Sequence, residues 1–222
     1  MVWLLNDVYD VENRAYLMSE KKMELMPLKI RSHRASSVMQ YDERYTPYIE
    51  MTRLLPFIQL VSRSTPNLNA AVTTLIDWWR PETHSFHLRT GEMTVTLQDI
   101  SMITALPIEG KPLCVSTDSE GWRQQMEALI GKSPQEPEVE YGGKKDRVPA
   151  GAPFTWIAAN FAHCPEDADD EVIQRYARMY MWYVISRTIF ADGTGKNAPW
   201  MWLKALTVFN NKVAVWESAF RD

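Results

Sequence analysis

The sequence predicts a mainly α-helical fold: a compact multi-helix domain with one short β-hairpin at about 85–97 and a buried central helix at about 170–191. Over most of the chain, apolar residues recur at helical spacing between capping residues, glycines and prolines. Around Thr90-Gly91 the spacing changes to two, which is typical of a hairpin. From Asp170 onward, apolar side chains cover nearly the whole circumference of a helix, which indicates burial on all sides.

The composition supports one folded domain with a preceding extension. The chain has 222 residues, 45% of them hydrophobic, which is enough for a sizeable core. Nine tryptophans and nine tyrosines favour a rigid aromatic interior, because disordered chains are poor in aromatic residues. We predict an N-terminal extension at 1–35, which mixes charges and methionines without a period, and a single domain at 36–222.

Two helices are predicted before the hairpin. The first covers about 47–62 and is broken or bent near Pro56. The second begins at Asn67, which is an N-cap residue, and its apolar face continues through Trp79. Pro81 then prevents the helix from continuing, because proline lacks the backbone N–H that the helix needs.

The hairpin is followed by a helix with a clear start signal. Apolar residues alternate with polar ones on the two arms of the hairpin at Phe86, Leu88, Met93, Val95 and Leu97. Gly91 can take the positive φ that a tight turn needs. Thr96 and Asp99 have the spacing of a capping box, which predicts a helix at 97–105.

The middle of the chain contains further local signals. A short extended piece at Pro112–Val115 is a candidate strand. Thr117 and Glu120 have the spacing of a second capping box, which predicts a helix that reaches Ile130 and is closed by Gly131.

The last third is predicted to hold an exposed loop and three helices. Residues 131–151 are rich in proline, glycine and charge, as in an exposed loop. A helix follows at Phe154–Cys164, and then Asp169 or Asp170 caps the central helix. Pro199 is expected to start the final helix, because proline is favoured in the first turn.

Charge and cysteine content exclude several classes of protein. A net charge of −4 argues against a chain whose main role is to coat nucleic acid, because phosphate neutralisation requires an excess of Lys and Arg. The stretch 21–34 is locally basic and fits a solvated leader, an import signal or a nucleic-acid arm. No apolar run approaches the roughly 20 residues that cross a bilayer, so we expect an intracellular protein outside the membrane. Cys114 and Cys164 lack paired spacing and are expected to be reduced, buried thiols.

No catalytic, cofactor-binding or metal site is predicted. The Gly-Lys pairs all lack the first glycine of a phosphate loop, and the patterns GxGxxG, HExxH and GxSxG do not occur. His84 and His87 would point to opposite faces of a strand, so we do not expect them to share a metal ion. Arg80, Glu82 and His84 are instead expected to fasten the preceding helix to the hairpin through charge-assisted hydrogen bonds.

Four segments, in this order, carry a shared pattern: WRPETHSFHL, GEMTVTLQDI, LPIEGKP and RYARMYMWYVISRTIFADGTGKNAPWMWL. They resemble the signature, the long helix and the tryptophan-bearing segment of the plant mobile domain family, found in plant transposable elements and in host proteins related to MAINTENANCE OF MERISTEMS. The resemblance covers about 27–222. The positions that match the signature, which we expect to be structural, are Trp79, Arg80, Pro81, Glu82, Thr83, His84, Phe86, Gly91, Glu92, Thr96, Leu97, Asp99, Gly110, Arg175 and Tyr176.

The resemblance implies a non-enzymatic protein-interaction module in the nucleus, with roles in transposable-element silencing, gene-expression control and meristem maintenance. It implies partnership with other mobile-domain proteins and with a phosphatase of the protein-phosphatase-seven type, and it leaves chromatin association open. The family also carries the label "aminotransferase-like". We expect no cofactor, because the sequence lacks the βα alternation of the scaffold that pyridoxal enzymes usually have.

The alternative function is a transposon-derived nucleic-acid-binding accessory domain, in which basic residues at 21–34 and 144–147 contact phosphate. The acidic balance disfavours such direct binding. A third alternative is an uncharacterised enzyme. The origin as a host gene or an element copy, the partner surface and the oligomeric state all stay open. The last segment, Val213–Asp222, departs from the family's Ser-Trp-Gly-Ser-Ala helix and then stops, so we expect a truncated C-terminus.

Overall fold

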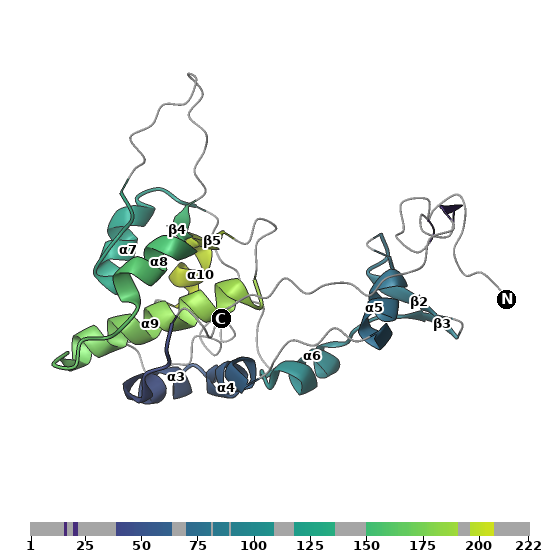
Figure 1. The fold of residues 1–222 in the computed structure, drawn as a ribbon, viewed down its shortest axis with the longest axis horizontal. Coiled ribbons are helices and arrows are strands. Elements are labelled where there is room, and N and C mark those ends of the chain that lie inside the picture. Colours follow the sequence, from purple (N-terminus) through teal and green to yellow (C-terminus); the bar gives the residue numbers. More distant parts are fainter. Residues whose placement is uncertain are drawn as a thin grey trace, which may run out of the picture. The chain divides into compact units, whose positions relative to one another are not determined.

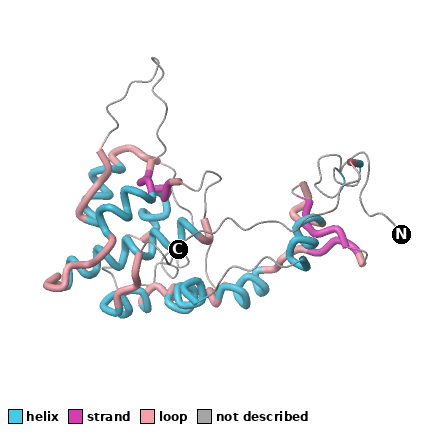
Figure 2. Tube along the Cα trace, in the orientation of Figure 1, coloured by secondary structure: helices cyan, strands magenta, loops and turns pink. Residues whose placement is uncertain are grey.

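The fold is mainly helical, as the sequence predicts (Figure 1). The computed structural model describes residues 16, 20–21, 39–63, 70–80, 82–88, 90–108, 118–135, 150–190 and 196–206. The chain divides into two compact units, and each is described by itself. The first unit comprises Met1–Ser32 and Ser64–Ile103, and the second comprises His33–Arg63 and Thr104–Asp222. Strands occupy only short stretches of the described chain, as the magenta segments of Figure 2 show.

The second unit is built around one long helix. Its elements, in chain order, are η1 (Glu43–Tyr45), α3 (Thr46–Glu50), α4 (Leu55–Arg63), α7 (Trp122–Ile130), β4 (Gly151–Pro153), α8 (Phe154–Phe161), α9 (Asp170–Arg187), β5 (Asn197–Pro199) and α10 (Trp200–Ala205). Of these, η1, α3, α7, α8, β5 and α10 all contact α9. The sequence therefore places the central helix correctly, although α9 ends at Arg187 rather than near residue 191.

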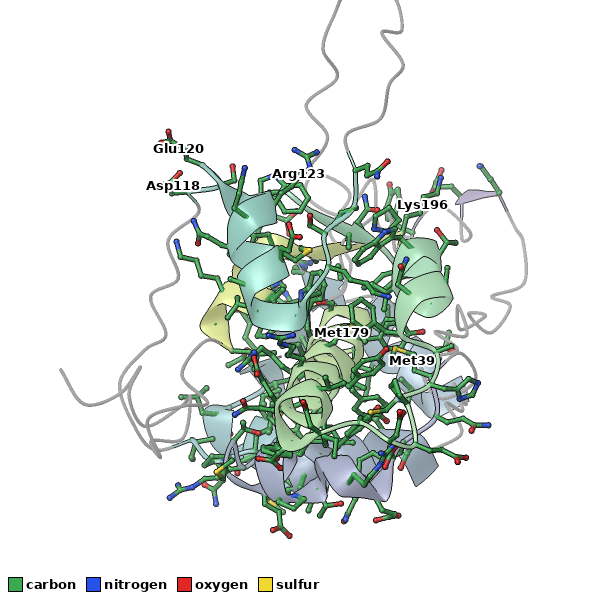
Figure 3. All side chains as sticks on the ribbon, turned by 90° about the vertical axis from the view of Figure 1, so that its left-hand side faces the viewer. Met39, Asp118, Glu120, Arg123, Met179 and Lys196 are labelled. Atoms are coloured by element: carbon green, nitrogen blue, oxygen red, sulfur yellow. The ribbon has the colours of Figure 1, made fainter. Side chains whose placement is uncertain are left out.

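Helix α9 has the burial pattern that its sequence predicts. Ten consecutive residues, 177–186, are buried, and Figure 3 shows Met179 at the centre of the surrounding elements. The core around α9 receives Ile49 from α3, Met126 from α7 and Ile157 from α8, all of them fully buried. At the start of the helix, Oδ1 of Asp169 accepts a hydrogen bond from the backbone N–H of Val172 at 2.9 Å. The predicted N-cap of the central helix is thus confirmed at Asp169.

The other helix boundaries of the second unit follow local signals in most places. The predicted break in the first helix is found between α3 and α4, and Pro56 lies in the first turn of α4, where its missing N–H costs nothing. Gly131 closes α7 in the left-handed conformation, with φ of 81°, and its N–H donates to the carbonyl oxygen of Glu127. Pro199 precedes α10 as its N-cap residue, close to its predicted place.

Two sequence-based expectations for the second unit are wrong. Helix α7 begins at Trp122, after Gly121 in the left-handed conformation, and no side chain caps it. The predicted capping box of Thr117 and Glu120 is therefore not its start, and Thr117 itself lies outside the described residues. The box failed as a signal because a turn of the chain at Gly121 intervenes before the helix.

The second error is a missed sheet. The sequence predicts a single hairpin, whereas β4 and β5 form a separate antiparallel pair with Ala152 opposite Ala198. Gly151 fits this sheet tightly: its φ is +152°, and a Cβ atom there would lie 2.2 Å from the carbonyl oxygen of Ala198. Strands of three residues that pair across a long stretch of chain have no periodicity that sequence could reveal.

The first unit contains the predicted hairpin in a three-stranded form. Its elements are α5 (Ala70–Asp77), β1 (Trp79–Arg80), β2 (Ser85–Leu88), β3 (Gly91–Met93) and α6 (Leu97–Thr104), and the last residue of α6 falls in the second unit. The strands pair in the order β1-β2-β3, all antiparallel.

The expectation that the helix continues through Trp79 is wrong, because α5 ends at Asp77 and Trp79 starts β1. The hairpin also ends at Met93, before the predicted limit at residue 97. At Trp79 strand pairing replaces the helical preference, since the neighbouring carbonyl oxygen of Trp78 accepts a hydrogen bond from the N–H of His87 at 2.9 Å.

Several predictions fall on residues that the structure does not describe. These are most of the extension at 1–35, the strand at Pro112–Val115, the loop residues 136–149, Cys114 and the segment after Leu206. The division at residues 35 and 36 stays a prediction. Cys164 is a buried free thiol, as expected. In the described part of the chain, none of the helices combines the length and the apolar character that a membrane span requires.

Candidate interaction surface

The described signature positions from Trp79 to Glu92 lie together in one small part of the first unit, formed by β1, β2, β3 and the turn at 82–84. We call it the hairpin corner. Trp79 lies opposite Phe86 in the sheet register, and their rings meet edge to face with centroids 4.8 Å apart. The ring of His84 stands at 88° to that of Trp79, with centroids 6.4 Å apart. These contacts give the corner a small aromatic core, because edge-to-face ring pairs are favourable at such distances.

A polar network crosses the other face of the hairpin corner. The carboxylate of Glu92 accepts a hydrogen bond from Ser85 Oγ at 3.2 Å and lies 3.2 Å from His87 Nε2. Ser85 is only 6% exposed, and its hydroxyl also bonds with that of Thr83 at 2.6 Å. Since Glu92 stands directly opposite His87 in the β2–β3 register, the network joins two strands. Each of these polar side chains therefore has a partner within the hairpin corner.

A charge-assisted contact across the strands joins His87 to Glu92, and it becomes an ion pair when His87 is protonated. The expected fastening of the preceding helix to the hairpin stays a prediction. The expectation that His84 lies on a strand is wrong: it lies in the turn, with φ of 52°. Its carbonyl oxygen accepts a hydrogen bond from Thr94 Oγ1 at 2.7 Å. Pro81 lies outside the described residues.

The capping box that opens α6 is confirmed atom by atom. The N–H of Asp99 donates to Thr96 Oγ1 at 3.2 Å, and the N–H of Thr96 donates to Asp99 Oδ2 at 2.9 Å. The hydroxyl of Thr96 donates to the same carboxylate oxygen at 2.6 Å. These hydrogen bonds from Thr96 lower the pKa of Asp99, because they stabilise its charged form.

Beyond the capping box, α6 exposes apolar side chains. Leu97 is 71% exposed, Met102 79% and Ile103 64%, and no residue of α6 is buried. We call Leu97, Ile100 and Ile103, which follow one another at a spacing of three on one side of the helix, the α6 surface. A contiguous patch of exposed apolar side chains marks an interaction site more often than a single exposed apolar residue does. The sequence predicts this helix but not the exposure of its apolar residues.

The remaining signature positions do not belong to the hairpin corner. Arg175 and Tyr176 lie on α9 in the second unit, and Gly110 is outside the described residues. The guanidinium of Arg175 pairs with Glu171, one turn earlier on the same helix. The ring of Tyr176 packs edge to face on Phe161, with centroids 5.3 Å apart. Both positions have roles in packing and surface pairing.

One polar cluster in the second unit joins η1 to the segment before α9. Arg44 donates to Asp42 Oδ2 at 2.6 Å and to the carbonyl oxygen of Pro165 at 2.9 Å. Burial raises the pKa of the Cys164 thiol and also that of the Tyr45 hydroxyl. Both groups therefore stay protonated at neutral pH, which leaves this thiol unsuited to nucleophilic attack.

Among the described residues, no group of three or more His, Cys, Asp and Glu side chains lies close enough together to hold a metal ion. His87 Nε2 lies 3.2 Å from one carboxylate, that of Glu92. What the geometry offers is an aromatic corner, a capped helix and an exposed apolar face.

A sequence model of the plant mobile domain matches residues 56–216. This chain belongs to the plant mobile domain family. The match includes the hairpin corner, α6 and α9, and it confirms the family that the signature segments indicate. No solved structure matches the chain significantly.

Three proteins from Arabidopsis thaliana are similar to more than half of this chain. Protein MAIN-LIKE 2 is 36% identical over 143 residues, which are 64% of this chain and 20% of the relative. Protein MAINTENANCE OF MERISTEMS is 37% identical over 124 residues, or 55% of this chain and 24% of the relative. The serine/threonine-protein phosphatase 7 long form homolog is 30% identical over 151 residues, or 68% of this chain and 11% of the relative. The matched segment is thus a quarter or less of each relative.

Proposed function

We propose that this plant mobile domain chain is a non-enzymatic protein-interaction module of the nucleus. Its role is in transposable-element silencing, gene-expression control and meristem maintenance. Its partners are other mobile-domain proteins and a phosphatase of the protein-phosphatase-seven type.

One observation carries the proposal: the matched segment recurs in relatives whose names indicate different roles. MAIN-LIKE 2 and the phosphatase 7 long form homolog both contain it, although it is 20% of one and 11% of the other. A segment that recurs in different chains is a module whose role does not depend on the rest of each chain. A module present on both a meristem-type protein and a phosphatase homologue is suited to bring such proteins together.

The α6 surface supports the same proposal. Leu97 and Ile103 are more than half exposed, although each is a residue type that is usually buried. We assign this surface to contact with a second plant mobile domain, because apolar faces of a shared module can bury each other on association.

The polar groups of the described residues support a non-enzymatic role. Glu92 is already engaged by Ser85 and His87, and a carboxylate so engaged is less available as a general base. Cys164 and Tyr45 keep their protons at neutral pH, since burial raises the pKa of each. These groups fit the requirements of a stable scaffold better than those of a reaction.

A binding experiment with purified proteins tests the proposal. The chain is titrated into MAIN-LIKE 2 and into the phosphatase 7 long form homolog, and the Kd is measured for the unmodified chain, for Ile103→Glu and for Gln98→Glu. Both substitutions add one negative charge to exposed positions of α6, but only Ile103 lies on the α6 surface, and Gln98 lies on the opposite side of the helix. We expect at least a tenfold weaker Kd for Ile103→Glu, because a charge is placed in an apolar contact, and little change for Gln98→Glu.

Three results would contradict the proposal. The first is that the chain binds neither relative, and the second is that the two substitutions weaken binding equally. The third is salt-dependent binding to DNA at low ionic strength, which would favour the nucleic-acid alternative. Imaging of a fluorescent fusion in plant cells tests the nuclear location separately.

A further inference from the structure

Three side chains meet where α8 begins and α9 ends. The guanidinium carbon of Arg187, the last residue of α9, lies 4.3 Å from the ring centroid of Phe154 and 5.2 Å from that of Tyr183. The two rings pack edge to face, with centroids 5.5 Å apart and planes at 87°. A guanidinium held over two aromatic faces is fixed in position, because both contacts are favourable cation–π interactions.

The same cluster contains polar atoms that the rest of the described chain does not satisfy. Arg187 Nε and the hydroxyl of Tyr183 are both buried, and neither has a hydrogen-bond partner among the described residues. Tyr183 is 0% exposed, whereas Arg187 is partly exposed. A buried donor without a partner is costly, so such groups are rare and call for a water molecule or a ligand.

Packing alone accounts for only part of this arrangement. A cation in the last turn of α9 is favoured by the helix dipole, and the rings of Phe154 and Tyr183 provide a surface for it. Neither effect supplies an acceptor for Arg187 Nε or for the Tyr183 hydroxyl. Phenylalanine at position 183 would give the same ring packing without an unsatisfied hydroxyl.

The two donors also share an electrostatic environment. Burial raises the pKa of the Tyr183 hydroxyl, and the charge of Arg187 partly opposes that rise, which places the hydroxyl within reach of the guanidinium's field. The hydroxyl therefore keeps its proton at neutral pH and can donate it in a hydrogen bond. A positive charge beside a neutral donor is the arrangement that attracts an oxyanion.

We propose that Arg187 and Tyr183 form a binding site for a carboxylate. A guanidinium matches the planar, two-oxygen geometry of a carboxylate, and Arg187 could donate to it from Nε and a terminal nitrogen together. The Tyr183 hydroxyl supplies a further donor. The site presents one positive charge, which balances a carboxylate of charge −1 better than a phosphate of charge near −2. The carboxylate comes from an acidic side chain of a partner or from a small free acid.

Nuclear magnetic resonance of the Arg187 Nε–H group tests this site, and it requires no knowledge of the partners proposed above. The two probes are acetate, as a small free acid, and a capped hexaglutamate peptide, as a source of acidic side chains. Chloride at equal ionic strength and a hexaglutamine peptide are the matched controls. We expect a saturable shift of the Nε–H resonance with acetate, with hexaglutamate or with both, and none with the controls. Tighter binding of the peptide would identify the partner's side chain as the source, and tighter binding of acetate would identify a free acid.

Variants separate the site from general attraction to a basic residue. Tyr183→Phe keeps the aromatic packing and should weaken the Kd by roughly tenfold, because a hydrogen bond to a charged group is lost. Arg187→Lys keeps the charge and should weaken the Kd as well, since the planar fork is lost. Because this variant has no guanidinium Nε–H, its Kd is measured from the backbone amide resonance of position 187. Tyr180→Phe is the control: Tyr180 is also a buried tyrosine of α9, but it packs on the rings of Tyr41 and Tyr45.

The proposal would be overturned by any of three results. The first is an Nε–H resonance that does not respond saturably to acetate or to hexaglutamate, which would mean that a buried water already satisfies the donors. Alternatively, Tyr180→Phe weakens binding as much as Tyr183→Phe does. Finally, inorganic phosphate binds more tightly than either carboxylate probe, which would contradict the assigned chemistry.

Discussion

Helices α9 and α6 are both rich in apolar residues, yet their environments are opposite. In α9, residues 177–186 are all buried, and the helix is contacted by elements that precede it in the sequence, such as α3, and by elements that follow it, such as α10. In α6, no residue is buried, and Met102 is the most exposed of the large apolar side chains described. The comparison shows that the apolar residues of a helix set how much apolar surface it can bury, whereas the elements packed against it determine how much of that surface is buried. For a protein whose role is proposed to be interaction, the unburied helix is the informative one.

The largest expected effect is the loss of a core side chain from α9. Trp182 is 0% exposed, and its indole N–H donates to the carbonyl oxygen of Pro199 at 2.9 Å. Trp182→Ala should lower the free energy of unfolding by about 3–5 kcal/mol, because it leaves a cavity and an unpaired carbonyl. Met102→Ala on α6 should change it by less than about 0.5 kcal/mol. Urea denaturation followed by circular dichroism measures both.

Trp182→Phe serves as the milder core variant, since it keeps the aromatic ring and loses only the hydrogen bond and part of the volume. If Met102→Ala proved as costly as Trp182→Ala, the contrast between the two helices would be wrong.

The next effect compares a glycine of each unit. Both Gly151 in β4 and Gly91 in β3 have φ in the region that favours glycine, at +152° and +124°. An alanine Cβ at Gly151 would lie 2.2 Å from the carbonyl oxygen of Ala198, whereas at Gly91 nothing lies within 4 Å. Gly151→Ala should cost roughly 3 kcal/mol, because strain and overpacking each cost about 1–3 kcal/mol. Gly91→Ala should cost about 1 kcal/mol from backbone strain alone. Thermal and urea unfolding of the two variants provide the comparison, and equal costs would show that the β4–β5 contact is looser than described.

Helix caps should have similar effects in both regions, despite the different burial. Asp169 caps α9 and Thr96 caps α6, each through a side-chain oxygen that accepts a backbone N–H. Asp169→Ala should lower the free energy of unfolding by about 1 kcal/mol. Thr96→Ala should speed amide hydrogen exchange in α6 by about fivefold, because a cap contributes about 1 kcal/mol to local helix stability. Asp169→Asn and Thr96→Ser are the controls, since both replacements retain a capping oxygen. An effect of Thr96→Ala on α9 exchange would contradict the local character of the cap.

The smallest expected effect concerns pH. Hydrogen bonds from Arg44 lower the pKa of Asp42 below its ordinary value of 3.8. A carboxylate with a lowered pKa in the folded state stabilises the fold above the unfolded pKa, and this contribution is lost as pH falls through the folded pKa. The unmodified chain should therefore lose more stability than Asp42→Asn when the pH falls from 5 to 2. Urea titrations at several pH values measure this difference, with Glu43→Gln as the control at the exposed neighbouring position. Parallel pH profiles of the unmodified chain and Asp42→Asn would refute the role of the Asp42–Arg44 pair.

Local chemistry explains which parts of the fold could be predicted. The Thr96–Asp99 box, the Asp169 cap and the Gly131 stop each depend on residues within four positions of one another, so their signals are present in the sequence itself. The same holds for the segments that indicate the plant mobile domain, which the family match confirms. Among the candidate site residues, the structural role expected of the hairpin corner stays a prediction, and the corner holds the aromatic and polar contacts described above.

What the sequence alone determined, then, is the family, the mainly helical class and the position of the central helix. What only the tertiary structure decided is pairing and exposure: the β4–β5 sheet, the transfer of Trp79 from a helix to β1, the open face of α6 and the unsatisfied donors beside Arg187. The physical reason is distance along the chain. A cap is satisfied by its own neighbours, whereas burial, strand pairing and the satisfaction of a polar atom depend on residues that only the folded chain brings near.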